Sequence, residues 1–315
     1  MKRVQMKIKE FNGMKRSFGF KIAFFSILFP FFHRRMESAE VTNWIDRQKN
    51  DTIKKYLKKR YKNIVEKYKF TEVTSDNIDL ISPIWIFWWQ GEENMPLIVK
   101  KCFQSVLNNA NGHPVKLITK YNMNEYVSIP DYIIEKVGNG IISIIHLSDI
   151  VRISLISQHG GLWLDSTILV TGSINVYGNF YTIHHLKYGH HPSDRKWTQF
   201  LLGGVKNNPL FLMVRDLLFE YWKTENFMVD YFLIDYCIYL AYDSNLSIKN
   251  MIDSVPYSNP ELYYFLSYFD EPYIAEKFKE ICESTNFHKL KWKEPLKIHT
   301  NPGELTYYGY LLGKD

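Results

Sequence analysis

Three charged side chains near the middle of the chain have types and a spacing suited to binding a negatively charged ligand. Asp149 and Arg152 are three residues apart, and Asp165 follows a short apolar segment. A diphosphate that leaves during a reaction carries charge that must be neutralised, and a divalent cation held by a carboxylate and by the phosphates neutralises it. The three residues therefore indicate chemistry on a nucleoside diphosphate sugar.

The elements around these residues would place them at one edge of a sheet. Ser148 has the residue type of a helix N-cap, and the apolar residues after it predict a helix over residues 148–159. The glycines at 160–161 would end this helix and let the chain turn close to the sheet. Residues 162–164 are apolar and predict a buried strand, so Asp165 would emerge at the carboxyl edge, where open α/β sheets bind ligands.

This segment resembles the aspartate signature of family 32 glycosyltransferases, and especially that of their bacterial capsular polysaccharide synthesis branch. In this family an Asp and an Arg on a helix precede two glycines, an aromatic residue and an Asp-x-Asp motif. The third position of that motif is Thr167 in this chain. The matching residues are Asp149, Arg152, Gly160, Gly161, Trp163 and Asp165.

Two further segments carry the same resemblance. Residues 84–91, followed by Met95 and Pro96, look like the first strand and first loop of the family. Residues 288–293 resemble a His-Lys-Leu-x-Trp-Lys box of the capsular branch. The similarity therefore spans about residues 80–300, and it implies a DXD-type sugar transferase of the GT-A fold.

The resemblance and the residue types together predict the site residues. We expect Asp165 and Asp235 to be catalytic, and Asp165, Thr167 and His288 to hold Mn²⁺ or Mg²⁺. Asp235 is singled out because an acid within an apolar helix needs a partner or a function. The residues expected to bind the donor nucleotide and sugar are Trp88, Trp89, Gln90, Asp149, Arg152, Gly161, His288 and Lys289.

Most of these residues also have a purely structural interpretation. Asp165 can be a turn residue after a strand, and Asp149 with Arg152 can be an ion pair on a helix surface. Trp88 can be an ordinary core residue. Asp235 can make a buried structural hydrogen bond, and residues 288–293 can be a basic surface strand with its apolar side chains packed inward.

The charge distribution separates the N-terminal part of the chain from the rest. Residues 1–70 contain 19 Lys or Arg and 6 Asp or Glu, a net charge of +13, whereas the remainder contains 20 and 27, a net charge of −7. We expect an N-terminal extension over 1–70 and a glycosyltransferase domain over 80–315. Because the basic charge lies outside the globular part, we expect no nucleic-acid partner.

An apolar run over residues 22–32 favours contact between the basic extension and an anionic membrane surface. The run is shorter than the roughly 20 residues that span a bilayer, so we expect peripheral association with the inner face of the cell membrane. A signal peptide and an ordinary packing helix are the alternatives. Three widely separated cysteines, Cys102, Cys237 and Cys282, favour a reducing, cytoplasmic compartment.

The rest of the chain alternates predicted strands and helices. Strands are expected over 84–89, 115–119 and 141–145, and helices over 97–107, 209–222 and 230–242. A strong aromatic segment over 257–278 is expected to be helical in part. The pattern predicts an α/β fold of the GT-A type, with a Rossmann-like, mostly parallel sheet flanked by helices, a helical C-terminal part and a basic N-terminal helical extension.

The resulting hypothesis is transfer of a sugar from a UDP-sugar to a lipid-linked or growing polysaccharide acceptor in capsule or surface polysaccharide synthesis. The resemblance implies retention of configuration at the anomeric carbon. One alternative is a glycoside hydrolase that uses paired carboxylates, such as Asp165 with Asp149 or Asp235. The other is a non-enzymatic protein that binds a membrane or nucleic acid through its basic N-terminus.

Overall fold

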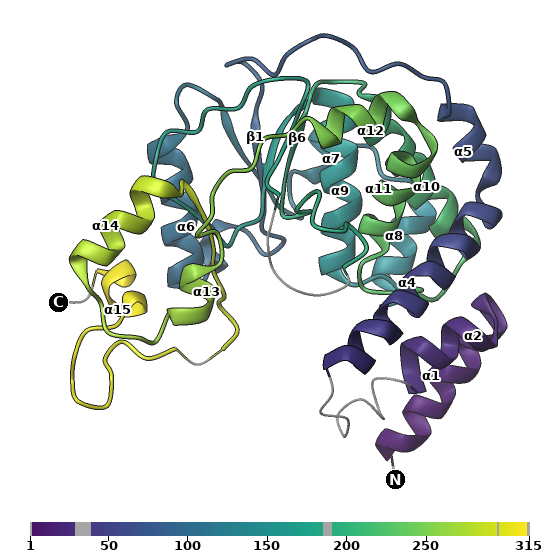
Figure 1. Cartoon of the computed structure of the whole chain (residues 1–315), viewed down its shortest axis with the longest axis horizontal. Coiled ribbons are helices and arrows are strands. Elements are labelled where there is room, and N and C mark those ends of the chain that lie inside the picture. Colours follow the sequence, from purple (N-terminus) through teal and green to yellow (C-terminus); the bar gives the residue numbers. More distant parts are fainter. Residues whose placement is uncertain (1, 29–38, 185–190, 295, 314–315) are drawn as a thin grey trace.

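A five-stranded sheet forms the centre of the protein (Figure 1). The computed structural model describes residues 2–28, 39–184, 191–294 and 296–313. The strand order is β2-β1-β3-β6-β5; β1 is parallel to β2 and β3, whereas β6 is antiparallel to β3 and β5. Four of the five strands therefore run in one direction. Their bounds are Ile84–Phe87 (β1), Val115–Ile118 (β2), Gly161–Leu164 (β3), Phe180–Thr182 (β5) and Leu201–Gly204 (β6).

Helices cover both faces of this sheet. In Figure 1, α6, α13, α14 and α15 lie on the left of the sheet, and α7 to α12 lie on its right. The helices after the first strand are α6 (Leu97–Asn109), α7 (Met123–Tyr126), α8 (Asp131–Gly138), α9 (Ile144–His159), α10 (Pro209–Thr224), α11 (Leu233–Ser244), α12 (Leu246–Asp253), α13 (Tyr264–Tyr268), α14 (Ala275–Ser284) and α15 (Tyr307–Leu312). A short 3-10 helix, η2, spans Glu92–Asn94.

Alternate side chains of each strand pack into two separate hydrophobic cores on the two faces of the sheet. Trp85 and Phe87 of β1 and Trp163 of β3 belong to the core shared with α8 to α11. Ile84 and Leu162, one residue earlier in the same strands, belong to the core shared with α6 and α13 to α15. Because both faces are covered, the central strands are apolar throughout, as expected for a sheet buried on both sides.

The predicted α/β class with a mostly parallel sheet, a helical C-terminal part and a basic N-terminal helical extension is confirmed. The strand predicted over 84–89 ends at Phe87, so Trp88 and Trp89 lie just beyond the sheet. The helices predicted over 97–107, 209–222 and 230–242 correspond to α6, α10 and α11, with ends shifted by up to three residues.

The strand predicted over residues 141–145 is wrong, and so is the N-cap at Ser148. Helix α9 begins at Ile144, because the Ser143 side chain accepts a hydrogen bond from the His146 backbone N–H and caps the helix there. The Ser148 hydroxyl instead donates to the Ile145 carbonyl at 2.5 Å. Asp149 and Arg152 therefore lie in the middle of α9, and both are buried.

The two glycines after α9 allow the chain to enter β3 at very close range. Gly160 caps the helix with φ 72°, and Gly161 has φ 98°. A Cβ at Gly161 would lie 2.1 Å from the Pro83 carbonyl oxygen, which accepts a hydrogen bond from the Leu162 N–H. Only glycine fits this position without displacing the backbone before β1.

The basic N-terminal extension is helical and packs on the domain. It consists of α1 (Lys2–Phe18), α2 (Phe20–Ala23), a π-helical turn (Phe24–Leu28), α4 (Ala39–Arg60) and α5 (Lys62–Tyr68). Ile53 and Leu57 of α4 are buried, and the Tyr236 hydroxyl of α11 donates to the Asn50 side chain at 2.6 Å. Helix α4 shares a hydrophobic core with α11, so the packing does not separate the two regions. The division into residues 1–70 and 80–315 stays a prediction.

The described part of the apolar run over 22–32 also faces the protein. Ile22, Ala23 and Ile27 are buried in the core that includes α4, whereas Phe20 is exposed. Residues 29–32 lie outside the described part of the chain. No helix among the described residues is long and apolar enough to cross a membrane. The expected contact with a membrane surface stays a prediction.

Gly161→Ala should destabilise the protein strongly, because the new methyl group collides with the Pro83 carbonyl and the positive φ strains any other residue. We expect urea denaturation to show a loss of about 3 kcal/mol in the free energy of unfolding. Gly138→Ala is the matched control, because a Cβ at this helical position meets no atom within 4 Å. It should raise the stability by up to about 1 kcal/mol; equal effects of both changes would contradict the close approach at Gly161.

Candidate functional site

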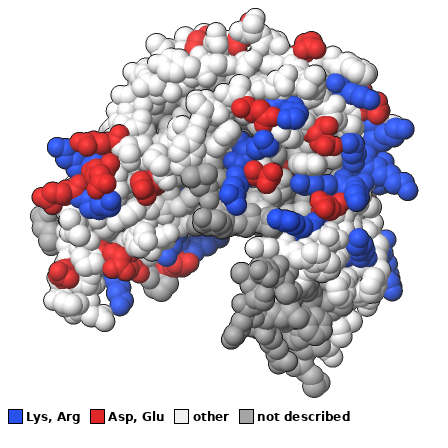
Figure 2. Space-filling model, in the orientation of Figure 1, with Lys and Arg blue, Asp and Glu red and all other residues white. Residues whose placement is uncertain are grey.

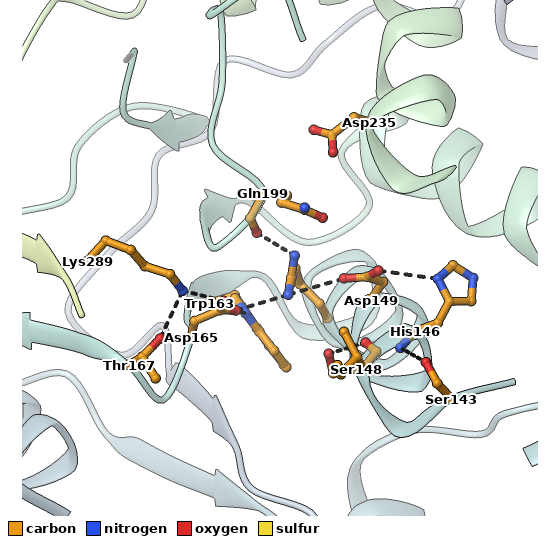
Figure 3. A network of polar contacts seen from close by, with 12 residues as sticks. Ser143, His146, Ser148, Asp149, Trp163, Asp165, Thr167, Gln199, Asp235 and Lys289 are labelled. Carbon is orange, nitrogen blue, oxygen red and sulfur yellow. Dashed lines mark hydrogen bonds and ion pairs between the residues drawn. The ribbon is translucent and has the colours of Figure 1, made fainter. Parts of the chain in front are cut away.

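A row of alternating charges lies at the carboxyl edge of β3 (Figure 3). The Lys289 ammonium is 2.9 Å from Asp165 Oδ2, and the Arg152 guanidinium is 3.0 Å from Asp165 Oδ1. The same guanidinium nitrogen is 3.3 Å from Asp149 Oδ1. The structure thus brings together four residues that the sequence predicted as site residues, from α9, from the end of β3 and from strand β7 (Phe287–Lys289).

Arg152 is the most buried member of this row. Its side chain is 3% exposed, and it donates to the Gln199 backbone carbonyl at 2.6 Å as well as to Asp165. The guanidinium lies 4.8 Å from the centre of the Trp163 ring, a distance at which a cation is attracted to an aromatic face. A buried charge with partners on three sides is fixed in position, so Arg152 is a rigid part of the site.

Asp165 is more accessible, with 28% of its side chain exposed. Oδ1 also accepts a hydrogen bond from Trp163 Nε1 at 2.9 Å. Burial by itself would raise the pKa of this carboxyl, but Lys289 and Arg152, together with the Trp163 hydrogen bond, bring the pKa below its ordinary value. Asp165 is therefore an anion at neutral pH and cannot donate a proton.

His146 belongs to the same network, although sequence reasoning missed it. Its Nδ1 is 3.3 Å from Asp149 Oδ2, and its Nε2 accepts a hydrogen bond from Trp222 Nε1 at 2.8 Å. Because Nε2 accepts, the ring proton is on Nδ1 and faces Asp149. His146 and Asp149 are three residues apart and share one face of α9. A helix that begins at residue 148, as the sequence predicts, leaves His146 outside it.

Lys289 reaches the site from a second, two-stranded sheet. Strand β7 (Phe287–Lys289) pairs antiparallel with β4 (Ile168–Val170), so Lys289 lies opposite Ile168. Its ammonium also contacts Thr167 Oγ1 at 2.9 Å and lies 4.7 Å from the centre of the Phe200 ring. The lysine ammonium is therefore held between a hydroxyl, a carboxylate and an aromatic face.

His288 is not part of this cluster. It is fully buried on β7, with Nε2 2.9 Å from the Thr171 hydroxyl and its ring 5.0 Å from the centre of Phe265. Burial lowers the pKa of this imidazole to about 4. Its residue position is adjacent to Lys289, but its side chain packs in the core instead of reaching Asp165, so its roles in metal and donor binding stay predictions.

The aromatic residues after β1 lie at the same edge of the sheet. Trp88 is buried and packs edge-on against Trp292 with ring centres 5.4 Å apart. Its indole Nε1 has no hydrogen-bond partner among the described residues. Trp89 is half-buried against Phe87, and Gln90 is exposed. Trp89 and Gln90 have the exposure that a ligand would need, whereas Trp88 needs a rearrangement to stack on one.

Asp235 lies above the network on α11, without a direct contact to it in Figure 3. The side chain has no exposed surface; Oδ1 accepts from Trp197 Nε1 at 2.9 Å, and Oδ2 is 3.8 Å from His191 Nε2. Burial raises the pKa of this carboxyl to about 8. This geometry matches the structural interpretation of a buried hydrogen bond, and the catalytic role of Asp235 stays a prediction.

Residues with metal-binding side chains are not grouped at this site. Among the described residues, no three His, Cys, Asp or Glu side chains come together in a way that could hold a metal ion. Asp165 is flanked by Thr167 and Lys289 instead of a second carboxylate. The expectation of Mn²⁺ or Mg²⁺ held by Asp165, Thr167 and His288 stays a prediction that this geometry does not favour.

One cavity on the described surface lies at the other end of the sheet. It has a volume of about 470 Å³ and is lined by residues 78–81, 111, 113 and 174–177. These residues precede β1, β2 and β5, so the cavity is at the amino ends of these strands. Open α/β sheets bind ligands at the carboxyl ends, so the charged row is the stronger candidate site.

The fold and the charged row define an α/β protein with a cluster of paired charges at the carboxyl edge of its sheet. A family model described as capsular polysaccharide synthesis protein matches residues 34–311. The chain belongs to this family. No curated protein matches the sequence.

Two solved structures resemble the fold distantly. One is titled "PaToxG Glycosyltransferase", with 14% identity, coverage of 69% of this chain and 90% of that chain, and a TM-score of 0.38. The other is a transferase solved as a double cysteine-to-serine mutant, with 10% identity, coverage of 58% of this chain and 90% of that chain, and a TM-score of 0.32. Similarity at this level has no bearing on the function of the chain.

The raised pKa of Asp235 makes stability depend on pH. Between the ordinary value of 3.8 and about 8, the folded protein keeps the Asp235 proton and the unfolded chain does not. The free energy of unfolding therefore falls as the pH rises through this window. Asp235→Asn mimics the protonated acid, so its stability relative to wild type should rise by about 1 kcal/mol per pH unit up to about pH 8.

Urea denaturation of both proteins from pH 5 to pH 9 measures this difference. Asp253→Asn is the control, because Lys196 and Lys249 hold the pKa of this surface carboxyl near 2, where it is ionised throughout the tested range. A constant difference between wild type and Asp235→Asn would show that Asp235 is already charged when folded.

Proposed function

We propose that the protein is a glycosyltransferase that moves a sugar from a nucleoside diphosphate sugar, with UDP-sugars as the first choice, to a glycan acceptor. The observation that carries this proposal is the row formed by Lys289, Asp165, Arg152 and Asp149 at the carboxyl edge of the sheet. Membership of the capsular polysaccharide synthesis family supports a role in building a surface glycan.

The residues of the row suit different parts of such a donor. Lys289 is 19% exposed and has an N–H bond beyond those used by Asp165 and Thr167, so it can donate to a diphosphate oxygen. Arg152 adds positive charge behind it. Asp149, held by His146 and Arg152, orients the guanidinium toward the donor sugar. Trp89 and Gln90 lie at the same edge of the sheet and suit the nucleotide base of the donor.

In the proposed reaction the bond between the anomeric carbon and the diphosphate oxygen breaks, and a bond from the acceptor oxygen to that carbon forms. The diphosphate takes the electron pair of the broken bond, and the acceptor hydroxyl gives its proton to a phosphate oxygen. Lys289 and Arg152 stabilise the charge that grows on the diphosphate. Attack from the face of the leaving group retains the anomeric configuration, as the resemblance to family 32 glycosyltransferases implies.

We further propose that the acceptor is a lipid-linked oligosaccharide at the inner face of the cell membrane. The support is a basic surface on α4 and α5, where the blue side chains gather on the right of Figure 2. Lys55, Lys58, Lys59 and Lys62 line a hollow of about 330 Å³ on this surface. Anionic lipid attracts such a surface by about 1 kcal/mol for each lysine close to it.

Asp149→Asn tests the donor site, because it removes the charge of Asp149 while keeping its shape. We expect wild type to release free sugar slowly from at least one nucleoside diphosphate sugar of a panel, since transferases leak the sugar to water when no acceptor is present. The variant should lose about 100-fold or more in this rate, as when a polar group that stabilises a transition state is removed. Chromatographic measurement of nucleotide release gives both rates.

Asp253→Asn serves as the matched control for this loss, because its carboxylate is held by two lysines on the surface of α12. It should keep the rate of wild type within about twofold. Release of sugar from a simple glycoside, with no nucleoside diphosphate sugar turned over, would instead support the hydrolase alternative.

Reversing the charge of Lys55, Lys59 and Lys62 to Glu should weaken binding to vesicles made of equal parts phosphatidylglycerol and phosphatidylcholine. We expect a loss of about tenfold or more in affinity, and weaker binding of wild type as salt is raised. Vesicle sedimentation measures both effects.

The control is the same reversal at Lys100, Lys116 and Lys279, which are exposed and lie on other surfaces. It changes the net charge equally but leaves the basic surface of α4 and α5 intact. Equal losses from both triple variants would point to net charge alone, and an unchanged affinity of the first variant would contradict membrane contact through this surface.

A further inference from the structure

Lys289 occupies the position where a divalent cation would be held by the aspartate motif. Its ammonium is 2.9 Å from Asp165 Oδ2 and 2.9 Å from Thr167 Oγ1, the first and third positions of that motif. Figure 3 shows the ammonium between these two side chains. One positive charge from the chain itself therefore lies against the oxygens that would face a bound metal ion.

With Lys289 and two further donors, three of the four lone-pair positions of Asp165 are engaged. Oδ1 accepts from Arg152 at 3.0 Å and from Trp163 Nε1 at 2.9 Å. A divalent cation such as Mg²⁺ needs about six oxygen ligands in a strict geometry, and each ligand must offer a lone pair that no donor occupies. Asp165 meets this need poorly, and Thr167 offers only a neutral hydroxyl that already accepts from Lys289.

No further ligand compensates for this at the described site. His288, the nitrogen ligand expected from the sequence, is buried against Phe265 and bonded to Thr171. Asp149 faces Arg152 and His146. The residues present do not fit a divalent cation.

The charges of the site point the same way. Two carboxylates, Asp149 and Asp165, face two permanent cations, Arg152 and Lys289. A metal site normally has an excess of negative ligands, and a dication added here would lie beside two positive side chains. Like charges a few ångströms apart repel strongly in a partly buried site, so metal binding would require Lys289 to leave.

The lysine is also held in place before any ligand arrives. The antiparallel pairing of β4 and β7 sets Lys289 opposite Ile168, and its backbone N–H donates to the Leu262 carbonyl at 2.8 Å. The Phe200 ring lies against the ammonium, with 4.7 Å to the ring centre. Because the side chain is ordered in advance, binding an anion costs little further side-chain entropy.

We propose that Lys289 takes the place of the divalent cation, so that this protein binds the diphosphate of its donor without a metal ion. Lys289 contacts the diphosphate directly, and Arg152 supplies the second positive charge from behind Asp165. Thr167 is the natural partner of such a lysine, because a second carboxylate at this position would restore the excess negative charge that attracts a metal. The inference rests on the proposed use of a nucleoside diphosphate donor.

The first test needs no variant. Calorimetric titration of the full chain with UDP, in EDTA and in Mn²⁺, should give dissociation constants that agree within about twofold. Mn²⁺ titrated alone and followed by its electron paramagnetic resonance signal should show no binding to the protein. Binding of UDP that tightens about tenfold or more in Mn²⁺, or Mn²⁺ binding that Asp165→Ala abolishes, would overturn the inference and leave the proposed function standing.

Lys289→Met tests the role of the ammonium itself. Loss of a charged hydrogen bond should weaken UDP binding about tenfold or more, equally in EDTA and in Mn²⁺. Lys291→Met is the matched control two residues away, where the lysine pairs with Glu294 on the surface, and it should bind UDP like wild type. Thermal melting checks that both variants are folded.

The outcomes separate the two proposals. If Lys289→Met binds UDP like wild type, the lysine does not contact the diphosphate and the inference fails. If UDP, GDP, CDP and ADP all fail to bind wild type with and without Mn²⁺, the proposed function fails first, and the inference falls with it.

Discussion

The candidate site depends on keeping the Arg152 guanidinium paired in a place that water barely reaches. Removing such a charge from water costs several kcal/mol, and only well-placed partners offset this cost. Two carboxylates, one backbone carbonyl and the face of Trp163 surround Arg152 in this protein. These partners come from three parts of the chain, so α9, β3 with the residue after it, and the segment before β6 are held in register by one side chain.

The position of β3 in the sheet also bears on the partners of Arg152. Gly161 lets β3 approach the backbone before β1, and Trp163, two residues further on, lies beside the guanidinium. The alternation of side chains along β3 sends Leu162 into the opposite core. A strand of four residues therefore joins two cores, and the partly exposed Asp165 follows directly after it.

The sequence predicted strands β1, β2 and β3, helices α6, α10 and α11, and the four residues of the charged row, because these depend on local patterns. Apolar runs with glycine turns identify β1 and β3, and three-residue spacing identifies the Asp149–Arg152 pair. It failed where the outcome depends on which of several side chains reaches a partner. The start of α9 depends on whether Ser143 or Ser148 accepts a hydrogen bond from a backbone N–H. With the start placed at residue 148, His146 lies outside the predicted helix and is not recognised as a neighbour of Asp149. Whether His288 or Lys289 faces Asp165 depends on how β7 pairs with β4, which no local pattern specifies.

The contact between Asp165 and Lys289 joins residues that are 124 positions apart. Contacts of this range form late, because a long loop must close before they contribute. During synthesis the chain emerges from its N-terminus, so the basic helices and the sheet can begin to order while Asp165 still lacks its lysine. A chain that ends before Lys289 would present an unbalanced acidic edge, and the charge balance of the site would be reached only after this lysine has been made.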